Sequence, residues 1–383
     1  MMRIAIAHRD LHAVTRGGIC TVYRELAGRF ADAGHYVTLI TQVTEHPLPP
    51  RPGFEVITLP RTGDMAAHRA AVAAALDTRQ VDVAECSTWE AELLGYAARP
   101  ADRRVPVLVR ADLSAHTMGC EPVLVDTERE LLGLAEAGVA VSRWAADDIA
   151  HAYGHQLPVL LNGVDRVRFR PGLRNAPLSS GRFLRLDRHG RTIGSAPVTG
   201  DTDALWGRLH GSRAGLPRLV WVGKLTTMKG ADVLQEMLPA LEGWAVVTVV
   251  LGHGLVQHPV TLEAHPNVQV VQDLTGQDLA GLYRSADYLL STSRWEGFGL
   301  AIAEALACGT PALLPAGLGT ARELVTDQVT GVLWRTAGDI VSALGRRPFL
   351  RGALPGEFDW DRNAAATLAM YETLVGAAQP AGR

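Results

Sequence analysis

The segment from Tyr288 to Pro311, YLLSTSRWEGFGLAIAEALACGTP, has the pattern of a strand, a glycine-rich loop, a helix and a second strand. Gly297 and Gly299 stand where the helix is expected to begin, and glycine lets a ligand approach the backbone closely. The free N–H groups and positive dipole end of such a helix favour a phosphate or diphosphate. Glu296 in the loop and Glu304 in the helix can accept hydrogen bonds from hydroxyl groups of the same ligand. The segment predicts an anion site flanked by two carboxylates; the alternative is a buried helix with a carboxylate at its mouth.

A second segment, Leu219 to Gly230 or LVWVGKLTTMKG, has the same order of strand, glycine turn and helix start. It contains Lys224 and Lys229, the only lysines in a chain whose other basic residues are all arginine. An ammonium group is a compact charge that binds phosphate oxygens well. We therefore expect both lysines to contact an anion; the alternative is a solvated loop that carries two lysines by chance.

Short apolar runs alternate with helical patterns through most of the chain, which is typical of parallel α/β sheets. A first series of strands is expected at residues 3–8, 36–41, 54–59, 81–85, 105–109, 138–141 and 158–161. A second series is expected at residues 218–222, 245–251, 268–271, 288–290, 311–314 and 331–334. The predicted fold class is α/β, with two Rossmann-like, doubly wound domains.

The domain boundaries follow from these two series. We expect a first domain at residues 1–171, a linker or insertion at 172–215 and a second domain at 216–361. The insertion is rich in Gly, Arg, Ser and Pro, and a hairpin is compatible with residues 183–193. The helical segment 362–383 is expected to pack back on the first domain. Ligands of open α/β sheets bind at the carboxyl ends of the strands, so the chemistry is expected between the domains.

Composition excludes several other classes of protein. The 383 residues carry 37 Lys and Arg against 40 Asp and Glu, so no net field would draw the chain to nucleic acid or to an anionic membrane. The longest apolar run, 244–251, is too short to span a membrane, and the N-terminal apolar stretch is too short for a signal peptide, so a cytoplasmic protein is expected. The four cysteines form no CxxC pair, and the Asp201 and Asp203 pair follows no strand, so no metal or other cofactor is expected.

Other residues are weaker candidates. Gly17 and Gly18, between the first strand and the first helix, can contact a phosphate, although glycine pairs often only turn the chain. His253 follows a strand and is as compatible with a structural role as with ligand binding. Carboxylates at the expected strand ends and loops of the first domain favour a cationic or polyhydroxylated ligand, although carboxylates are common at such ends; they are Asp10, Glu85, Glu90, Glu92 and Asp112.

These motifs together resemble the GT-B retaining glycosyltransferases of family four. The resemblance covers residues 3–375 except the insertion, and it implies a GT-B fold and a nucleotide-sugar donor held mainly by the second domain. It rests on four motifs in order: Arg16-Gly17-Gly18, Asn162-Gly163-Val164-Asp165 with Phe169, Val222-Gly223-Lys224 with Lys229-Gly230, and Glu296 to Glu304 with Cys308-Gly309-Thr310-Pro311.

The resemblance implies roles for single residues. Lys229 matches the lysine that neutralises the donor diphosphate, Glu304 the glutamate that binds the ribose, and Glu296 the one near the transferred sugar. Lys224 stands where the family more often has arginine, which keeps the charge but loses a bidentate contact. The remaining expected donor-binding residues are Gly17, Gly18, Gly223, Gly297, Phe298, Gly299, Leu300 and His253.

One family position departs from the pattern. Family members commonly carry a histidine six residues after a proline, where it contacts the donor sugar. Counted from Pro106, that position is Asp112, while His116 lies one helical turn further. The contact is expected from Asp112, with His116 as the alternative. The expected acceptor-binding residues are Asp10, Glu85, Glu90 and His116.

The implied reaction is a metal-independent front-face transfer with retention, without a protein nucleophile. Lys224, Lys229 and the helix start near Gly299 would stabilise the leaving phosphate. The expected donor is a UDP-linked hexose or amino-hexose, and the expected acceptor is a small polar molecule such as an aminocyclitol or amino sugar, as in antibiotic or other secondary-metabolite biosynthesis. Two alternatives remain on the same fold: a nucleotide-sugar epimerase, which needs no acceptor, and a noncatalytic nucleotide-sugar-binding protein.

Overall fold

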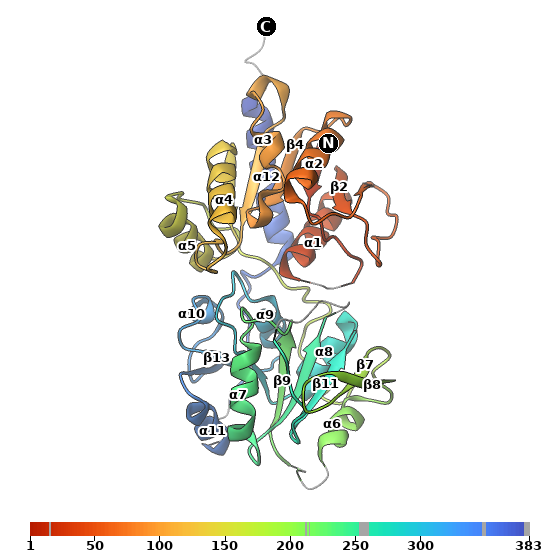
Figure 1. Ribbon diagram of the computed structural model, residues 1–383, viewed down its shortest axis with the longest axis vertical. Helices are drawn as coiled ribbons and strands as arrows, with labels where there is room; N and C mark the ends of the chain where they lie inside the picture. The colour runs from red at the N-terminus through yellow and green to blue at the C-terminus, as the bar shows by residue number, and fades with distance from the viewer. Residues whose placement is uncertain (15–16, 211–212, 214, 253–259, 347–349, 379–383) are drawn as a thin grey trace. The chain divides into compact units, whose positions relative to one another are not determined.

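The computed structural model describes residues 1–14, 17–210, 213, 215–252, 260–346 and 350–378. These residues form two compact units: one comprises Met1–Gly163 and Glu357–Arg383, and the other comprises Val164–Gly356 (Figure 1). Each unit has its own β-sheet and its own hydrophobic core. The chain passes from one unit to the other twice, so the first unit is built from both ends of the sequence.

The first unit contains a six-stranded sheet in the order β3-β2-β1-β4-β5-β6, in which all neighbouring strands are parallel. This is the strand order of a Rossmann domain. The strands are β1 (Arg3–Ala7), β2 (Tyr36–Gln42), β3 (Phe54–Leu59), β4 (Val83–Ser87), β5 (Val107–Ala111) and β6 (Ala137–Ala140). The helices are α1 (Gly18–Asp32), α2 (Met65–Asp77), η1 (Trp89–Ala91), α3 (Leu94–Ala97), η2 (Ala101–Arg103), α4 (Pro122–Leu134), α5 (Arg143–Tyr153) and α12 (Trp360–Ala378).

Buried apolar side chains hold this unit together. Every residue of β5, VLVRA, is buried, as expected for a parallel strand covered on both faces. α1 buries one face that includes Leu26 and Phe30. α12 packs on α1, where the rings of Phe30 and Tyr371 are 5.7 Å apart. The C-terminal helix therefore belongs to the first unit, where the sequence analysis places it.

The second unit contains an eight-stranded sheet in the order β14-β13-β12-β9-β10-β11-β7-β8. Its parallel strands are β9 (Arg218–Gly223), β10 (Val246–Leu251), β11 (Val268–Gln272), β12 (Tyr288–Leu290), β13 (Ala312–Pro315) and β14 (Gly331–Trp334). The hairpin β7 (Arg182–Leu186) and β8 (Thr192–Pro197) pairs antiparallel with β11. The helices are α6 (Thr202–His210), α7 (Ala231–Leu241), α8 (Gly276–Ser285), α9 (Leu300–Ala307), α10 (Ala321–Leu324) and α11 (Ala337–Arg346).

The structure differs from the sequence prediction in two places. Residues 172–215 are no separate linker, because β7 and β8 extend the second sheet and the indole N–H of Trp206 in α6 donates to Ser285 Oγ at 2.8 Å. The unit boundary therefore lies at Gly163 rather than at residue 171. The strand expected at residues 158–161 is reduced to one bridge, between Ala140 and Val159. Pro158 has no N–H group to donate to a strand ladder.

Candidate functional site

In the second unit, the loops that follow the neighbouring strands β9 and β12 lie against each other. Trp221 in β9 donates its indole N–H to Thr292 Oγ1 at 2.9 Å, and the Thr292 hydroxyl donates to the carbonyl oxygen of Gly230 at 2.8 Å. Gly230 has φ 63°, and a Cβ atom there would lie 1.9 Å from the Thr292 carbonyl oxygen, so this close approach requires glycine. The backbone N–H of Arg294 donates to the carbonyl oxygen of Met228 at 2.9 Å. The two lysine- and glutamate-bearing segments therefore form one site.

This packing brings Lys229 to the loop that precedes α9. Lys229 Nζ lies 2.6 Å from Glu296 Oε1, and Ser293 Oγ donates to the same carboxylate oxygen at 2.8 Å. The Lys229 and Glu296 side chains are 23% and 12% exposed, so a ligand can reach both. α9 begins after Gly299, which has φ 87°, and no described side chain caps the helix. A cation, a carboxylate and the N–H groups of a helix start thus lie together, which suits an anion that carries hydroxyl groups.

Glu304 lies on α9 and is half-buried. The hydroxyl of the fully buried Tyr283 donates to Glu304 Oε2 at 3.3 Å. Burial raises the pKa of Tyr283, and the charge of Glu304 raises it further, so the phenol stays protonated and able to donate. Tyr283 therefore orients a carboxylate that still reaches the surface.

The other expected donor residues take simpler positions. Gly223 ends β9, and a Cβ atom there would lie 3.0 Å from Cη2 of Trp221 and 3.4 Å from Lys229 Cγ, so a side chain would crowd the indole ring. Lys224 follows β9 and is half-buried. In the α9 region Gly297 and Phe298 are buried, whereas Leu300 is half-buried. Gly17 and Gly18 begin α1 in the first unit, and His253 and Arg16 lie outside the described residues.

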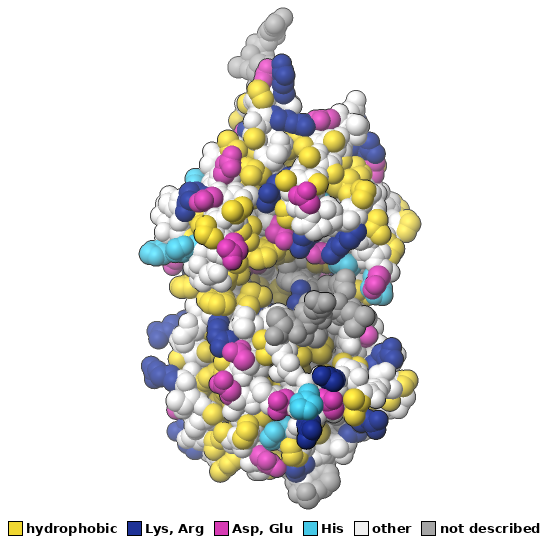
Figure 2. Space-filling view, in the orientation of Figure 1, with side chains coloured by type: hydrophobic (Ala, Val, Ile, Leu, Met, Phe, Trp, Pro, Cys, Tyr) yellow, Lys and Arg dark blue, Asp and Glu magenta, His cyan; other side chains and the backbone are white. Residues whose placement is uncertain are grey.

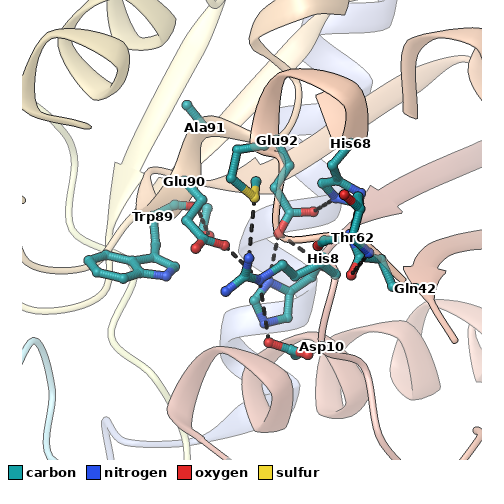
Figure 3. Close-up of polar contacts among 12 residues, drawn as sticks. His8, Asp10, Gln42, Thr62, His68, Trp89, Glu90, Ala91 and Glu92 are labelled. Carbon is teal, nitrogen blue, oxygen red and sulfur yellow. Dashed lines mark hydrogen bonds and ion pairs between the residues drawn. The ribbon is translucent and has the colours of Figure 1, made fainter. Parts of the chain in front are cut away.

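In the first unit, Glu92 forms the centre of a buried polar cluster (Figure 3). Its carboxylate accepts from the backbone N–H of Arg9 at 2.9 Å, lies 3.1 Å from His68 Nε2 and lies 3.2 Å from His8 Nδ1. Gln42 Nε2 is 3.0 Å from the other nitrogen of His68. Burial alone would raise the pKa of Glu92, but hydrogen bonds with His68 and His8 hold it at about 2. Glu92 is fully buried, so it joins the loops after β1 and β4 rather than facing a ligand.

Glu90 lies in a strained turn beside this cluster. Glu90 and Ala91 have φ 61° and 46°, a region that non-glycine residues rarely occupy. Arg69 stabilises the turn by donating its Nη2 group to the Glu90 carbonyl oxygen at 2.6 Å. The Glu90 carboxylate lies 2.8 Å from Arg9 Nε. Burial raises the pKa of Glu90, against the opposing effect of Arg9.

Asp10 also has cationic partners. Its carboxylate lies 2.6 Å from Arg61 Nη1, 3.5 Å from Arg9 Nε and 3.6 Å from His12 Nε2. The sequence predicts carboxylates that gather at this edge, and the structure shows that Asp10 and Glu90 each lie beside an arginine there. What this edge of the sheet offers is a set of adjacent carboxylates and guanidinium groups, which can both accept and donate hydrogen bonds.

Glu85 requires a correction. It is fully buried in β4, 2.7 Å from Arg110 Nε, and Tyr371 of α12 donates its hydroxyl to Glu85 Oε2. Arg110 also donates to Thr367 Oγ1 at 3.0 Å. Because the strand turns this side chain into the core under α12, Glu85 joins the C-terminal helix to the sheet and is no longer counted as acceptor-binding.

Asp112 and His116 lie in the connection from β5 to α4. Asp112 is half-buried, and its Oδ1 accepts the backbone N–H of Leu113 at 3.1 Å. His116 is exposed. The structure thus places both residues after the carboxyl end of β5, where the sequence predicts them, and both stay candidates.

Sequence reasoning missed Ser293, Arg9 and Tyr283. Ser293 precedes Glu296 by three residues, a spacing that could have suggested a bond to the loop carboxylate. Arg9 directly precedes the candidate Asp10, so a paired charge was readable there. Nothing local could have identified Tyr283, which is 21 residues from Glu304.

The described residues hold no group of three His, Cys, Asp or Glu side chains arranged to bind a metal ion. In the same part of the chain no helix is long and apolar enough to cross a membrane. Acidic and basic side chains are interspersed on the face shown in Figure 2.

Both the sequence and the fold of this chain are similar to those of known proteins. The family model described as "Glycosyl transferases group 1" matches residues 208–342, and that described as "Glycosyltransferase Family 4" matches residues 16–168. A D-inositol 3-phosphate glycosyltransferase of Xylanimonas cellulosilytica is 30% identical over 409 residues, which cover 93% of this chain and 91% of that protein. Sucrose-phosphate synthase from Thermosynechococcus elongatus has the same fold, with a TM-score of 0.76, 18% identity and coverage of 98% of this chain and 100% of that chain. Anabaena HepE in complex with UDP-glucose gives a TM-score of 0.66 at 16% identity, covering 99% and 98% of the two chains.

Two Rossmann-like units, with a lysine and two glutamates around a helix start in the second, define a GT-B glycosyltransferase. The chain belongs to glycosyltransferase family 4 and is a transferase enzyme.

Proposed function

We propose that this enzyme transfers a hexosyl or amino-hexosyl group from a UDP-linked donor to a hydroxyl group of a small polar acceptor, with retention of configuration. The observation that carries the proposal is the 2.6 Å ion pair between Lys229 and Glu296 in front of α9. A donor diphosphate competes with Glu296 for the ammonium group. Once the diphosphate has displaced Glu296 from the ammonium group, the Glu296 carboxylate is free to accept hydrogen bonds from the hydroxyl groups of the sugar.

The reaction follows from the position of these charges. The bond between the anomeric carbon and the β-phosphate oxygen breaks, and its electron pair stays on the phosphate. The acceptor oxygen bonds to the anomeric carbon from the same face, and its proton passes to the departing phosphate. Lys229, Lys224 and the N–H groups at the start of α9 stabilise the negative charge that grows on the phosphate, which is the main task of the site. No protein nucleophile takes part.

The donor nucleotide is assigned by two supporting points. Anabaena HepE, which shares the fold, was solved with UDP-glucose. Glu304 lies on α9, the helix whose start is proposed to bind the diphosphate, and Tyr283 orients its carboxylate. Its oxygens can accept hydrogen bonds from the hydroxyl groups of a ribose. This support favours a nucleoside diphosphate sugar in general and UDP in particular.

The acceptor is assigned to the first unit, at the loops after β1, β4 and β5. Asp10 and Glu90, each beside an arginine, can bind several hydroxyl groups of one polyhydroxylated ring. The relative from Xylanimonas is named for inositol 3-phosphate, which has such a ring. An aminocyclitol and a cyclitol phosphate share a cyclohexane ring and differ in charge, so turnover with one and not the other distinguishes them.

The test is a matrix of donors and acceptors. UDP-, GDP- and ADP-linked hexoses are each incubated with an aminocyclitol, a cyclitol phosphate and a neutral cyclitol, while released nucleoside diphosphate and product mass are measured together. We expect turnover with a UDP-sugar and a product with the donor's anomeric configuration by NMR. An inverted product, a changed donor sugar without acceptor, or no turnover with any pair would refute the proposal.

A further inference from the structure

Two buried carboxylates lie behind the connection from β5 to α4. Glu128 on α4 is fully buried, and Asp148 on α5 is 5% exposed. No Lys, Arg or His among the described residues lies within ion-pair distance of either carboxylate. Buried carboxylates without a cation are rare, because removing such a charge from water is costly. Their environment therefore needs an explanation.

Both carboxylates accept hydrogen bonds from backbone N–H groups of the connection between β5 and α4. The N–H of Ser114 donates to Asp148 Oδ2 at 2.7 Å, and the N–H of Ala115 donates to Glu128 Oε2 at 2.9 Å. The hydroxyl group of Thr117 also donates a hydrogen bond to Asp148 Oδ1. Residues 114–117 are thus attached to α4 and α5 through two side chains. Asp112 and His116, the two alternatives for the sugar contact that the family resemblance implies, lie beside and within the attached segment.

The groups that face Glu128 are acidic or neutral. Tyr153 on α5 donates its hydroxyl to Glu128 Oε2 at 2.6 Å, and Asp148 and Asp112 add like charge. Burial raises the pKa of Cys120, which lies in the same connection, and the charge of Glu128 raises it further. Burial raises the pKa of Glu128 to about 7, and the charges of Asp112 and Asp148 add to this rise, against the opposing effect of the hydrogen bonds from Ala115 and Tyr153. Glu128 is therefore divided between its neutral and charged forms near neutral pH.

Among the described residues, no Lys, Arg or His forms an ion pair with Glu128. Arg129, next along α4, lies 5.6 Å from the centroid of the Tyr153 ring and pairs with Asp126. On η1 and α3, which also pack on α4, the titratable side chains are Glu90, paired with Arg9, and Tyr96, whose hydroxyl accepts the N–H of Val105. The charge on Glu128 thus has no cation to balance it in this part of the described chain.

We propose that Glu128 is a positioning residue whose neutral form keeps the 112–117 connection, and with it Asp112 and His116, in the arrangement that sugar transfer requires. Among the described residues Glu128 Oε1 has no hydrogen-bond partner, so we assign the proton to this oxygen, while Oε2 keeps its bonds to Ala115 and Tyr153. Loss of the proton leaves Glu128, Asp148 and Asp112 as three like charges. Their repulsion loosens the connection and lowers activity. The inference rests on the proposed sugar transfer.

The test compares wild type, Glu128→Gln and Glu130→Gln. Glutamine keeps the shape and an acceptor oxygen but cannot ionise, and Glu130 is an exposed glutamate on the same helix. We expect the wild-type kcat/KM for the nucleotide sugar to fall about tenfold between about pH 6 and about pH 8. Glu130→Gln should follow wild type, whereas Glu128→Gln should be flat over this range. A fall of the same size in Glu128→Gln belongs to another group, such as His116, and overturns the inference.

A second measurement separates this inference from the proposed function. Amide hydrogen exchange of residues 113–117, corrected for the intrinsic effect of pH, should show protection that falls as pH rises in wild type and stays constant in Glu128→Gln. The affinity for UDP alone should be equal in the two proteins, because UDP is assigned to the second unit. If no donor is turned over, the proposed function fails while the exchange result still decides the role of Glu128. Protection that is independent of pH in wild type refutes the positioning role.

Discussion

The ammonium nitrogen of Lys229 and Oε1 of Glu296 are 2.6 Å apart, although 67 residues separate them in the chain. They meet because β9 and β12 are neighbouring parallel strands, so the loops at their carboxyl ends share one edge of the sheet. The same loops are joined by the bond between Trp221 and Thr292. The proposed catalytic cation and its counter-ion are thus held by the core of the second unit.

Replacing Lys229 by alanine should remove a charge that stabilises the leaving phosphate. We expect kcat/KM to fall by about 30- to 1000-fold, or roughly 2 to 4 kcal/mol. Lys229→Arg keeps the charge and should recover part of the loss. Steady-state kinetics with the best donor, with thermal unfolding as a control for folding, would measure this. Unchanged turnover in Lys229→Ala would contradict the assignment.

Replacing Glu296 by glutamine should separate sugar binding from diphosphate binding. The variant removes the counter-ion of Lys229, so the affinity for UDP alone should stay the same or increase. The KM for the nucleotide sugar should rise, because a carboxylate accepts hydrogen bonds from the sugar more strongly than an amide does. Calorimetric titration with UDP measures the affinity for the nucleotide, and steady-state kinetics with the UDP-sugar measure the KM. A weaker affinity for UDP would show that Glu296 serves the nucleotide and not the sugar.

Glu85→Gln should destabilise the protein without a specific effect on the acceptor. Removing one partner of the buried pair with Arg110 leaves an uncompensated charge, which costs about 3 to 5 kcal/mol. The control is Glu55→Gln, which breaks the more exposed pair with Arg79 and should cost about 0 to 1 kcal/mol. Urea unfolding measures both. A small loss of stability in Glu85→Gln together with a large rise in acceptor KM would return Glu85 to the acceptor site.

Glu92 should make the first unit sensitive to acid. Its pKa is held at about 2 against an ordinary value of 4.5, so the charged form stabilises the folded state. This stability is complete above the ordinary pKa and is lost as pH falls toward the folded value, a change of about 3 kcal/mol. Glu92→Gln should be less stable near neutral pH and should converge with wild type in acid. The free energy of unfolding of both proteins is measured across the acid range. A difference between wild type and Glu92→Gln that does not change with pH would disprove this role.

Gly230→Ala should disturb the loop pair, whereas Gly243→Ala should not. Both glycines have positive φ, 63° and 78°, but a Cβ atom at Gly230 would meet the Thr292 carbonyl oxygen at 1.9 Å while Gly243 has open space. Gly243→Ala should cost about 1 to 2 kcal/mol of backbone strain. Gly230→Ala should cost more and should also raise the KM for the donor. Equal losses of stability with an unchanged KM would show that the contact between the loops does not matter.

Much of the fold was readable from the sequence, because β-strands and helices have short periods that local residues set. The parallel strands of both units lie within a few residues of the predicted ranges. The hairpin β7–β8 was harder, since β8 is an edge strand with mostly exposed residues and no buried alternating pattern. The structure, and not composition, showed that this segment belongs to the second sheet.

The candidate site divides in the same way. Lys229, Glu296 and Glu304 could be picked out as candidates because each follows a predicted strand and lies within a few residues of a glycine in the local sequence. Glu85 was misassigned because its partners Arg110 and Tyr371 are 25 and 286 residues away, and nothing near Glu85 in the chain announces them.

The sequence by itself determined the two α/β units, the glycine-containing loops proposed to bind an anion, and the identity of the charged residues on them. Only the tertiary structure decided the partner of each carboxylate: Arg110 for Glu85, two imidazole rings for Glu92, Lys229 for Glu296, and no cation among the described residues for Glu128. The physical reason is that strand and helix formation depend on neighbours along the chain. The energy of a charge depends on what lies within a few ångströms in space, and long-range folding brings those groups together.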